Sequence, residues 1–252
     1  MRKGFRKVAR HCNAVWRRIL AGPNHGKIVA LEKEVDLLFD TIAEKQGVRS
    51  YAQYRQDIFA LIITRFKTGG YFVDFGATDG IGSSNSYVLE KDYGWTGILA
   101  EPARVWHDDL RKNRSAHIET DCVWSETGKT LKFSETKDPY LSTLASFRQS
   151  DEHRRARAKP ITYDVTTISL MDLLRKYDAP RQIDYLSIDT EGSEFDILRH
   201  FDFDAYDISV ITCEHNYTKS REDIRQLLES SGYRRAFHAI SRYDDWYVKA
   251  DL

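Results

Sequence analysis

The chain has 252 residues, enough to bury the core of one α/β domain, and its 12% aromatic and 30% charged residues exclude a disordered chain. Its 38 basic and 38 acidic residues cancel, so no net charge attracts the protein to nucleic acid, and no nucleic-acid partner is expected. Cys12, Cys122 and Cys213 lie far apart and indicate reduced thiols in a cytoplasmic protein, not a disulfide or zinc framework.

The first 27 residues form a basic arm, with eight positive charges and no negative one. One interpretation is a solvated arm. The other is a basic amphipathic helix that contacts an anionic membrane, at its inner face, or a polyanionic glycan. Arg17 and Arg18 interrupt the only apolar stretch of the arm, so no secretory signal is predicted. No apolar run approaches the ~20 residues that a membrane span needs.

Residues 28–46 are predicted to form the first helix. Its apolar side chains recur at three- and four-residue steps, at Ile28, Leu31, Val35, Leu38 and Ile42. This stripe is expected to pack on the main domain or on a second subunit, which leaves a homo-oligomer open. We therefore divide the chain into residues 1–50, an arm with an amphipathic helix, and a main domain of residues 51–252.

The main domain alternates helices and strands. A helix over 52–66 precedes strands predicted at 71–75, 96–101, 117–123, 162–168, 183–189 and 208–214, with helices between them. Two final strands lie near 233–239 and 246–250, and the polar segment 125–160 contains one extra strand at 130–133. This order predicts a doubly wound, mostly parallel sheet with helices on both faces. Such sheets bind ligands at the carboxyl ends of their strands.

A glycine-rich loop follows the first strand of the sheet. Residues 74–82 read Asp-Phe-Gly-Ala-Thr-Asp-Gly-Ile-Gly, and the next strand ends in Glu101, whose carboxylate can accept both hydroxyls of a ribose. These features suit S-adenosylmethionine or a nicotinamide dinucleotide. Asp74 would repel a pyrophosphate but attract the ammonium and sulfonium of adenosylmethionine. Tyr87 and Lys91 have the spacing of the catalytic pair of short-chain dehydrogenases, but they follow the glycines too closely to reach a nicotinamide.

Acidic residues follow two later strands. Asp189, Glu191 and Glu194 come after the strand at 183–189, and Glu194 suits the start of a helix. An acid that ends a buried strand is costly without a partner, so Asp189 is expected to face the ligand cleft. His215 closes the next strand and suits a general base for a hydroxyl acceptor. Alternatively, Asp189, Glu214 and His215 hold a divalent metal such as Mg²⁺ that lowers the pKa of the acceptor.

The segment 138–160 offers two further patterns. Asp138-Pro139-Tyr140 superficially matches an Asp-Pro-Pro-Tyr motif of amino-group methyltransferases, but it lies away from the fourth core strand, where that motif belongs, and indicates only a turn. An oxygen acceptor is therefore favoured over nitrogen. The basic run over 154–159 is either a solvated surface or a site for a phosphorylated or carboxylated acceptor.

Together these segments resemble the FkbM-type family of class I adenosylmethionine-dependent methyltransferases, from about residue 51 to 250. The matching segments are Gln53-x-x-Gln56-Asp57, 72–80, 84–91, 94–102, 184–194 and Glu214-His215-Asn216. The resemblance implies a Rossmann-like sheet of seven strands with the last antiparallel. It also implies O-methylation, often of sugars in glycans, glycolipids or natural products.

The resemblance also assigns roles. Asp74, Gly76 and Asp79 are expected at the methionine end, Glu101 at the ribose, and Asp121 and Cys122 beside the adenine. The full predicted cofactor site comprises Asp74, Gly76, Ala77, Thr78, Asp79, Gly80, Asn85, Glu101, Pro102, Asp121, Cys122 and Asp189. Catalysis is assigned to Asp189, Glu191 and His215, and acceptor preference to 138–160. Two alternatives remain at this point: a short-chain-type NAD(P)-dependent oxidoreductase, and a non-catalytic binding protein on a methyltransferase fold.

Overall fold

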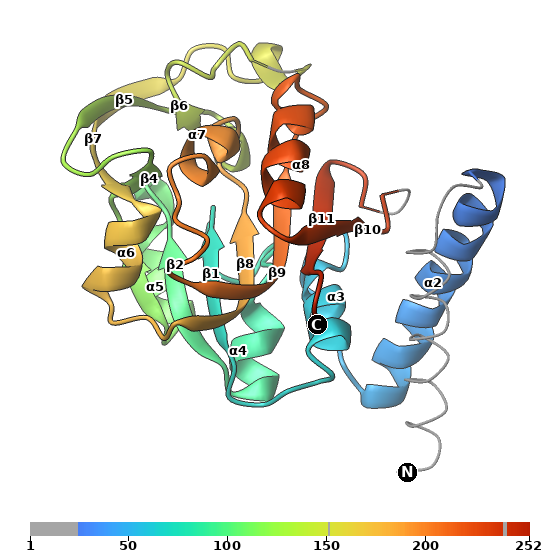
Figure 1. Cartoon of the computed structure of the whole chain (residues 1–252). Helices are drawn as coiled ribbons and strands as arrows, with labels where there is room; N and C mark the ends of the chain where they lie inside the picture. The colour runs from blue at the N-terminus through green and yellow to red at the C-terminus, as the bar shows by residue number, and fades with distance from the viewer. Residues whose placement is uncertain (1–24, 151, 239–240) are drawn as a thin grey trace.

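A computed structural model describes residues 25–150, 152–238 and 241–252 (Figure 1). Most of the basic arm, and the membrane contact predicted for it, lie outside these residues. No helix in the described part of the chain is long and apolar enough to cross a membrane. The predicted α/β architecture is confirmed: a mostly parallel sheet lies between two groups of helices.

The central sheet contains seven strands. Their spatial order is β10 (Tyr233–Ala236), β11 (Asp244–Lys249), β9 (Asp207–Glu214), β8 (Gln182–Ile188), β1 (Tyr71–Phe75), β2 (Thr96–Ala100) and β3 (His117–Glu119). β11 runs antiparallel to both of its neighbours, and the other pairings are parallel. The seven strands and the antiparallel last strand are as the resemblance implied.

Alternate residues of the central strands fill two cores. Val73 of β1 packs with Ile98 and Leu186 on one face, and Phe72 packs with Leu99 and Tyr185 on the other. β8 is buried from its second residue to its last, which is typical of a parallel strand covered on both faces. Helices contribute to the two cores as two groups: α6 (Leu170–Lys176), α7 (Glu194–Leu198) and α8 (Ser220–Ser230) to the first, and α2 (His25–Gln46), α3 (Gln56–Ile63), α4 (Tyr87–Tyr93) and α5 (His107–Asn113) to the second.

The predicted first helix, α2, packs on the domain of its own chain. Phe39 is buried, with its ring centroid 5.5 Å from that of Phe237 and 6.4 Å from that of Trp246. Ile42 is buried too, whereas Leu38, placed in the predicted stripe, is only half-buried. Phe39 therefore anchors the helix, although the three- and four-residue pattern omitted it.

The predicted third strand, 117–123, is wrong as a single element. It divides into β3 and β4 (Cys122–Trp124), which belong to different sheets. The Glu119 carboxylate accepts hydrogen bonds from the backbone N–H groups of Thr120 and Asp121, at 2.9 and 3.0 Å, and turns the chain between the two strands. A second sheet follows, in the order β4, β7 (Ile161–Ser169), β5 (Thr130–Glu135) and β6 (Thr143–Leu144).

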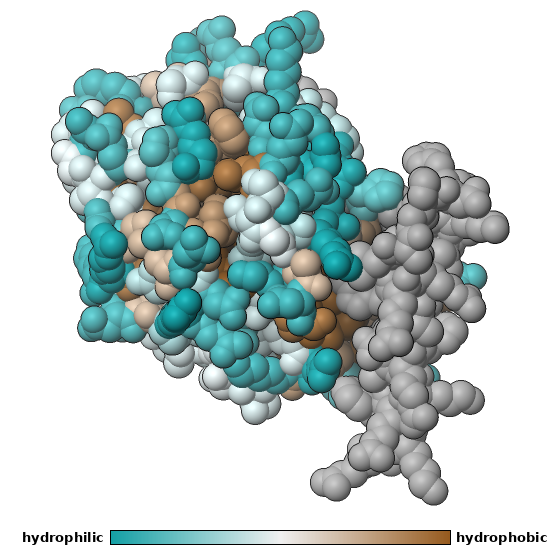
Figure 2. All heavy atoms as spheres, viewed as in Figure 1, coloured by the Kyte–Doolittle hydropathy of each residue, from teal (hydrophilic) through white to brown (hydrophobic). Residues whose placement is uncertain are grey.

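Some predicted helices are shorter than expected. The sequence predicts a loop and a helix over about 76–92, and the helix begins at Tyr87, because Gly76, Thr78, Gly80 and Ser83 all have positive φ and cannot continue a helix. The resulting eleven-residue loop, 76–86, occupies the carboxyl end of β1. Figure 2 shows hydrophobic residues in the upper centre of the view and again at the lower right, with hydrophilic residues over most of the remaining surface.

Candidate active site

A cavity of about 490 Å³ lies at the carboxyl ends of β1, β2, β8 and β9. Its volume falls within the range of pockets that hold small ligands and cofactors. Among the predicted cofactor residues, those that line it are Gly76, Thr78, Asn85, Glu101, Pro102, Cys122 and Asp189. The structure therefore brings together, in one cavity, segments that are up to 113 positions apart in the sequence, between residues 76 and 189.

Gly76 allows the end of β1 to approach the end of β8. Its φ is +77°, and a Cβ at this position would lie 2.1 Å from the carbonyl oxygen of Asp189. No side chain fits such a contact. Glycine is therefore needed here both for its conformation and for its lack of a side chain.

Arg114 holds the glycine loop in place, a role that the sequence pattern did not predict. Its guanidinium is buried and donates to the Gly80 carbonyl oxygen at 3.1 Å, the Ser84 hydroxyl at 3.2 Å and the Ser86 hydroxyl at 3.0 Å. It also forms an ion pair of 2.7 Å with Glu90. An arginine directly after a helix ordinarily indicates an exposed end, so no local pattern distinguishes this one.

The Asp74 side chain is also buried and supports the glycine loop. Its carboxylate accepts a hydrogen bond of 2.6 Å from the Ser86 hydroxyl, and the residue is 2% exposed and does not line the cavity. Burial raises the pKa of Asp74, against the hydrogen bond from Ser86 and the charge of Arg114. The Asp74 carboxylate thus supports the loop from outside the cavity lining, and its contact with the methionine end stays a prediction.

Three more residues of this loop that were predicted to bind the cofactor do not line the cavity. Ala77 and Gly80 belong to the turn, and Asp79 accepts hydrogen bonds from the backbone N–H groups of Ile81 and Gly82, both at 2.8 Å. Asp121 does not line the cavity either. The loop nevertheless presents Asn85 to the cavity. The Asn85 amide donates to Ser187 at 2.9 Å, and its buried Oδ1 has no hydrogen-bond partner among the described residues.

Glu101 lies at the end of β2, as predicted, and is 4% exposed. Its two carboxylate oxygens accept from the backbone N–H groups of Thr78 at 2.9 Å and Ala103 at 2.7 Å. Burial raises the pKa of Glu101 to about 7, against these two hydrogen bonds. Each oxygen keeps a further lone pair for a ligand. Beyond Glu101, the cavity has an apolar wall formed by Cys122, Val123, Phe133 and Leu144.

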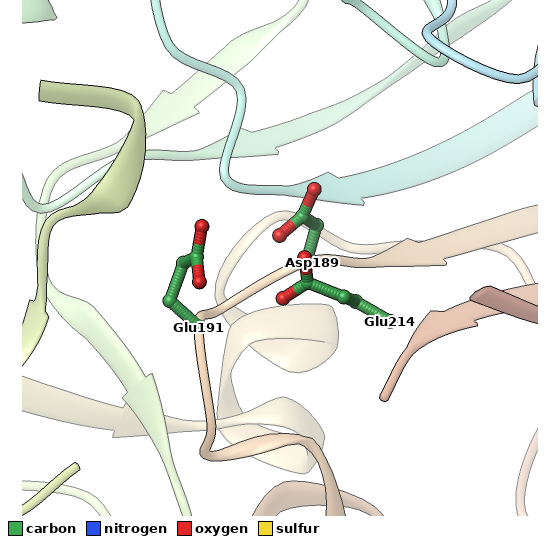
Figure 3. Close-up of side chains that lie close together, drawn as sticks. All are labelled: Asp189, Glu191 and Glu214. Carbon is green, nitrogen blue, oxygen red and sulfur yellow. The ribbon is translucent and has the colours of Figure 1, made fainter. Parts of the chain in front are cut away.

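Three carboxylates converge at the ends of β8 and β9 (Figure 3). Oxygen atoms of Asp189, Glu191 and Glu214 all lie within 4.8 Å of one another. Burial raises the pKa of Glu214 well above its usual range, and the charge of Asp189 adds to this. The Glu214 carboxyl therefore holds its proton more tightly than an ordinary glutamate does, and a side-chain hydrogen bond links it to Asp189. Burial also raises the pKa of Asp189, to about 7.

Glu191 is held by polar partners. Arg157, which is fully buried, places Nη2 2.5 Å from Oε2 of Glu191, and Asn216 donates to the same oxygen at 3.1 Å. Arg157 belongs to the basic run over 154–159, so this member of the run pairs with a carboxylate of the site. Glu194 accepts from the backbone N–H groups of Thr190 and Gly192 and, as expected, stabilises the start of α7.

His215 lies behind the strand end and does not line the cavity. Its Nδ1 accepts from the backbone N–H of Tyr217 at 3.0 Å, and its Nε2 is 3.8 Å from an oxygen of Asp245. Burial lowers the pKa of His215 to about 4. The acidic group with metal-ligand spacing therefore contains Glu191 in place of His215, and this position does not favour His215 as the base.

The remaining walls come from segments on either side of the sheet edge. Asp138, Tyr140 and His153 contribute from 138–160, where Asp138-Pro139-Tyr140 forms the predicted turn. Tyr54 and Tyr243 contribute from the opposite side and were not predicted. Tyr87 and Lys91, the dehydrogenase-like pair, lie in α4 and do not line the cavity.

Comparisons with known proteins point in one direction. A model of the methyltransferase FkbM domain matches residues 74–235. Methyltransferase sdnD of Sordaria araneosa is 26% identical over 200 residues, which cover 68% of this chain and 76% of that protein. Among solved structures, precorrin-6y C5,15-methyltransferase from Geobacter metallireducens aligns over 71% of this chain and 71% of its own, at 11% identity. The TM-score is 0.37, which is too low to support any inference about this chain.

Proposed function

This chain belongs to the FkbM methyltransferase family, which uses S-adenosylmethionine, and from this premise we propose that it methylates a hydroxyl group of a sugar. Family membership removes the dinucleotide-dependent oxidoreductase as an alternative. The sugar acceptor is supported by the sequence resemblance. The hydroxyl acceptor is supported by the carboxylates beside the cavity, because a hydroxyl must lose its proton during transfer and an acid–base group has to receive it.

The lining residues fit S-adenosylmethionine. Asn85 offers a buried, unpartnered Oδ1 that can accept from the ammonium group, and Glu101 keeps lone pairs for the ribose hydroxyls. The apolar wall around Cys122 and Phe133 suits the adenine. When bound, this cofactor supplies a methyl group on a positively charged sulfur. The residues of the chain then have to orient the acceptor and remove its proton.

The Asp189–Glu214 pair is the observation that carries the proposal. A side-chain hydrogen bond to Glu214 orients the Asp189 carboxyl, and burial raises the pKa of Asp189 to about 7 against this bond. The raised pKa of Glu214 favours Glu214 as the member of the pair that carries the proton. A general base is most effective when its pKa lies close to the working pH. Asp189 therefore accepts the hydroxyl proton, and Glu191, fixed by Arg157, completes the acidic side of the cavity.

A divalent cation is the alternative use of the same carboxylates. Asp189, Glu191 and Glu214 offer oxygen ligands of the kind that Mg²⁺ takes. Arg157 already supplies a positive charge to Glu191, which favours the proton-transfer role. Dialysis against EDTA separates the two. Transfer that is lost and then restored by MgCl₂ assigns a metal, and unchanged transfer supports Asp189 acting without one.

Transfer of labelled methyl tests the function itself. Enzyme and methyl-labelled S-adenosylmethionine are incubated with glycans and simple glycosides, and the product is hydrolysed and its linkage determined. We expect label in an O-methyl ether of a sugar. Label on nitrogen or carbon contradicts the proposal. Cofactor binding without any transfer favours a non-catalytic protein on this fold.

A further inference from the structure

The order of strands separates the two ends of the cavity. Going across the sheet, Glu101 follows β2, Gly76 follows β1, Asp189 follows β8, Glu214 ends β9, and Tyr243 immediately precedes β11. Glu101 and the apolar wall beyond it therefore lie at one end. Tyr243 lies at the other, with the carboxylates between them. The acceptor must reach the carboxylates from the side that the cofactor residues leave open, which is the side of Tyr243.

Two tyrosines form a wall at that end. The rings of Tyr54 and Tyr243 are close to parallel, with centroids 6.1 Å apart and an angle of 21° between them, and both line the cavity. Polar contacts fix their backbones. Gln56 accepts from the Tyr54 N–H at 2.8 Å and donates to Asp244 at 2.7 Å, and the carbonyl oxygen of Tyr243 accepts from the His215 N–H at 2.9 Å.

The charges around the two-tyrosine wall indicate an uncharged acceptor. Asp189, Glu191 and Glu214 lie on the inner side, and the buried cation among them, Arg157, is already paired with Glu191. Arg242 stands over the Tyr54 ring at 5.4 Å but does not line the cavity. Among the residues that the structure describes, no lysine or arginine lines the cavity, so a phosphate or carboxylate on the acceptor would find no such partner there and would be repelled by the Asp189 carboxylate.

Aromatic rings beside hydrogen-bonding groups match the two sides of a sugar. A pyranose presents C–H groups on its faces and hydroxyls around its edge. The tyrosine rings can pack against the C–H groups, and Glu214 and Asn216 can hydrogen-bond to the hydroxyls. Tyr54 and Tyr243 both lie outside the residues matched by the family model, 74–235.

We propose that Tyr54 and Tyr243 bind the ring of a neutral sugar and present one of its hydroxyls to Asp189. This assignment rests on the proposed function. It also places acceptor recognition on the opposite wall from the segment 138–160, and it selects against the phosphorylated or carboxylated acceptor that the basic run over 154–159 suggested.

The test is a binding titration of protein saturated with S-adenosylhomocysteine, followed by saturation-transfer NMR. The probes are neutral methyl hexosides and methyl 6-deoxyhexosides, with glucose 6-phosphate and glucuronic acid for comparison. We expect the neutral glycosides to bind better than the anionic sugars. Tyr54→Ala should weaken neutral glycosides about ten-fold, whereas Tyr54→Phe, which keeps the ring, should bind as the wild type does. Tyr93→Ala is the matched control, because Tyr93 lies in α4 outside the lining and its ring packs on Phe66, away from both tyrosines.

The outcomes distinguish this assignment from the proposed function. Anionic sugars that bind more tightly, or a loss of sugar binding in Tyr140→Ala but not in Tyr54→Ala, overturn the tyrosine site and leave sugar methylation intact. If no sugar of either kind binds and no sugar receives labelled methyl, both the tyrosine site and the sugar acceptor are wrong. An unchanged Kd for S-adenosylhomocysteine in each variant shows that the cofactor end is undisturbed.

Discussion

At the scale of single residues, the chemistry of the site depends on a proton shared between two acids. Asp189 and Glu214 lie on neighbouring strands, where two negative charges would repel each other. The raised pKa of Glu214 lessens this repulsion because it favours the neutral form, and Asp189, with a pKa of about 7, can gain or lose a proton near neutral pH. Because the two groups interact, the pH dependence of catalysis belongs to the pair.

Asp189→Asn removes the base while keeping the shape of the side chain. We expect kcat to fall at least about 100-fold, with the Kd for S-adenosylhomocysteine changed by less than about three-fold. In the wild type, kcat should rise with pH and level off above about 7, because Asp189 accepts a proton only after it has lost its own. Steady-state rates from pH 5.5 to 9 check this. A flat profile, or a variant that remains active, argues against Asp189 as the base.

Asn85→Ala removes the unpartnered oxygen proposed for the ammonium group. Loss of one hydrogen bond to a charged group costs about 1.5–3 kcal/mol, so the Kd for S-adenosylmethionine should rise about 10- to 100-fold. Calorimetric titration measures it. Asn85→Asp, which keeps an acceptor oxygen, is the control and should bind more tightly than the alanine variant. Equal affinity of wild type and Asn85→Ala would show that the ammonium group binds elsewhere.

At the scale of elements, sequence pattern predicted most strands but not their division between sheets. Buried strands such as β8 are runs of apolar residues ended by acids, so Asp189 and Glu101 could be located from the sequence. The turn at Thr120 and Asp121 could not, because it depends on the side chain of Glu119 bonding to the next two residues. Long-range pairs leave no local pattern either, as with Arg157 and Glu191, which are 34 residues apart.

The contact between β1 and β8 makes a prediction at this scale. Gly76→Ala should lower the free energy of unfolding by at least about 2 kcal/mol and weaken cofactor binding, since its Cβ would collide with the Asp189 carbonyl. Gly94→Ala is the matched control. Gly94 also has a positive φ, of 64°, but open space around its Cβ position, so only the conformational cost of about 1 kcal/mol remains. Urea unfolding compares them, and equal losses would contradict the steric argument.

At the scale of the whole molecule, zero net charge conceals a concentration of acids along one sheet edge. Burial raises the pKa of Asp189 and Glu101 to about 7 and that of Asp244 to about 8. Between about pH 4 and its folded pKa, each group holds a proton in the folded state that the unfolded chain has already lost. The stability from such a group is complete below its unfolded pKa near 4, and it is lost as pH rises through the folded value.

Stability should therefore fall between pH 6.5 and 8, by about 2 kcal/mol for the protein without ligand. The lowered pKa of His215 acts in the opposite direction, but only below about 6.5, so it does not cancel the fall in this window. Thermal unfolding across this range measures the effect. Asp244→Asn should reduce the slope, because its side chain cannot ionise. A stability that rises from pH 6.5 to 8 would show that the buried acids are not protonated.

We propose that the carboxylates at the ends of β8 and β9 promote methyl transfer to a sugar hydroxyl. The most direct test of this claim is one measurement: label transferred from methyl-labelled S-adenosylmethionine to a neutral glycan by wild type and by Asp189→Asn, with the labelled linkage identified. We predict an O-methyl sugar from the wild type, and a loss of at least about 100-fold in the variant at unchanged S-adenosylhomocysteine affinity. Equal transfer by both proteins, or label on any atom other than a sugar oxygen, would contradict the claim.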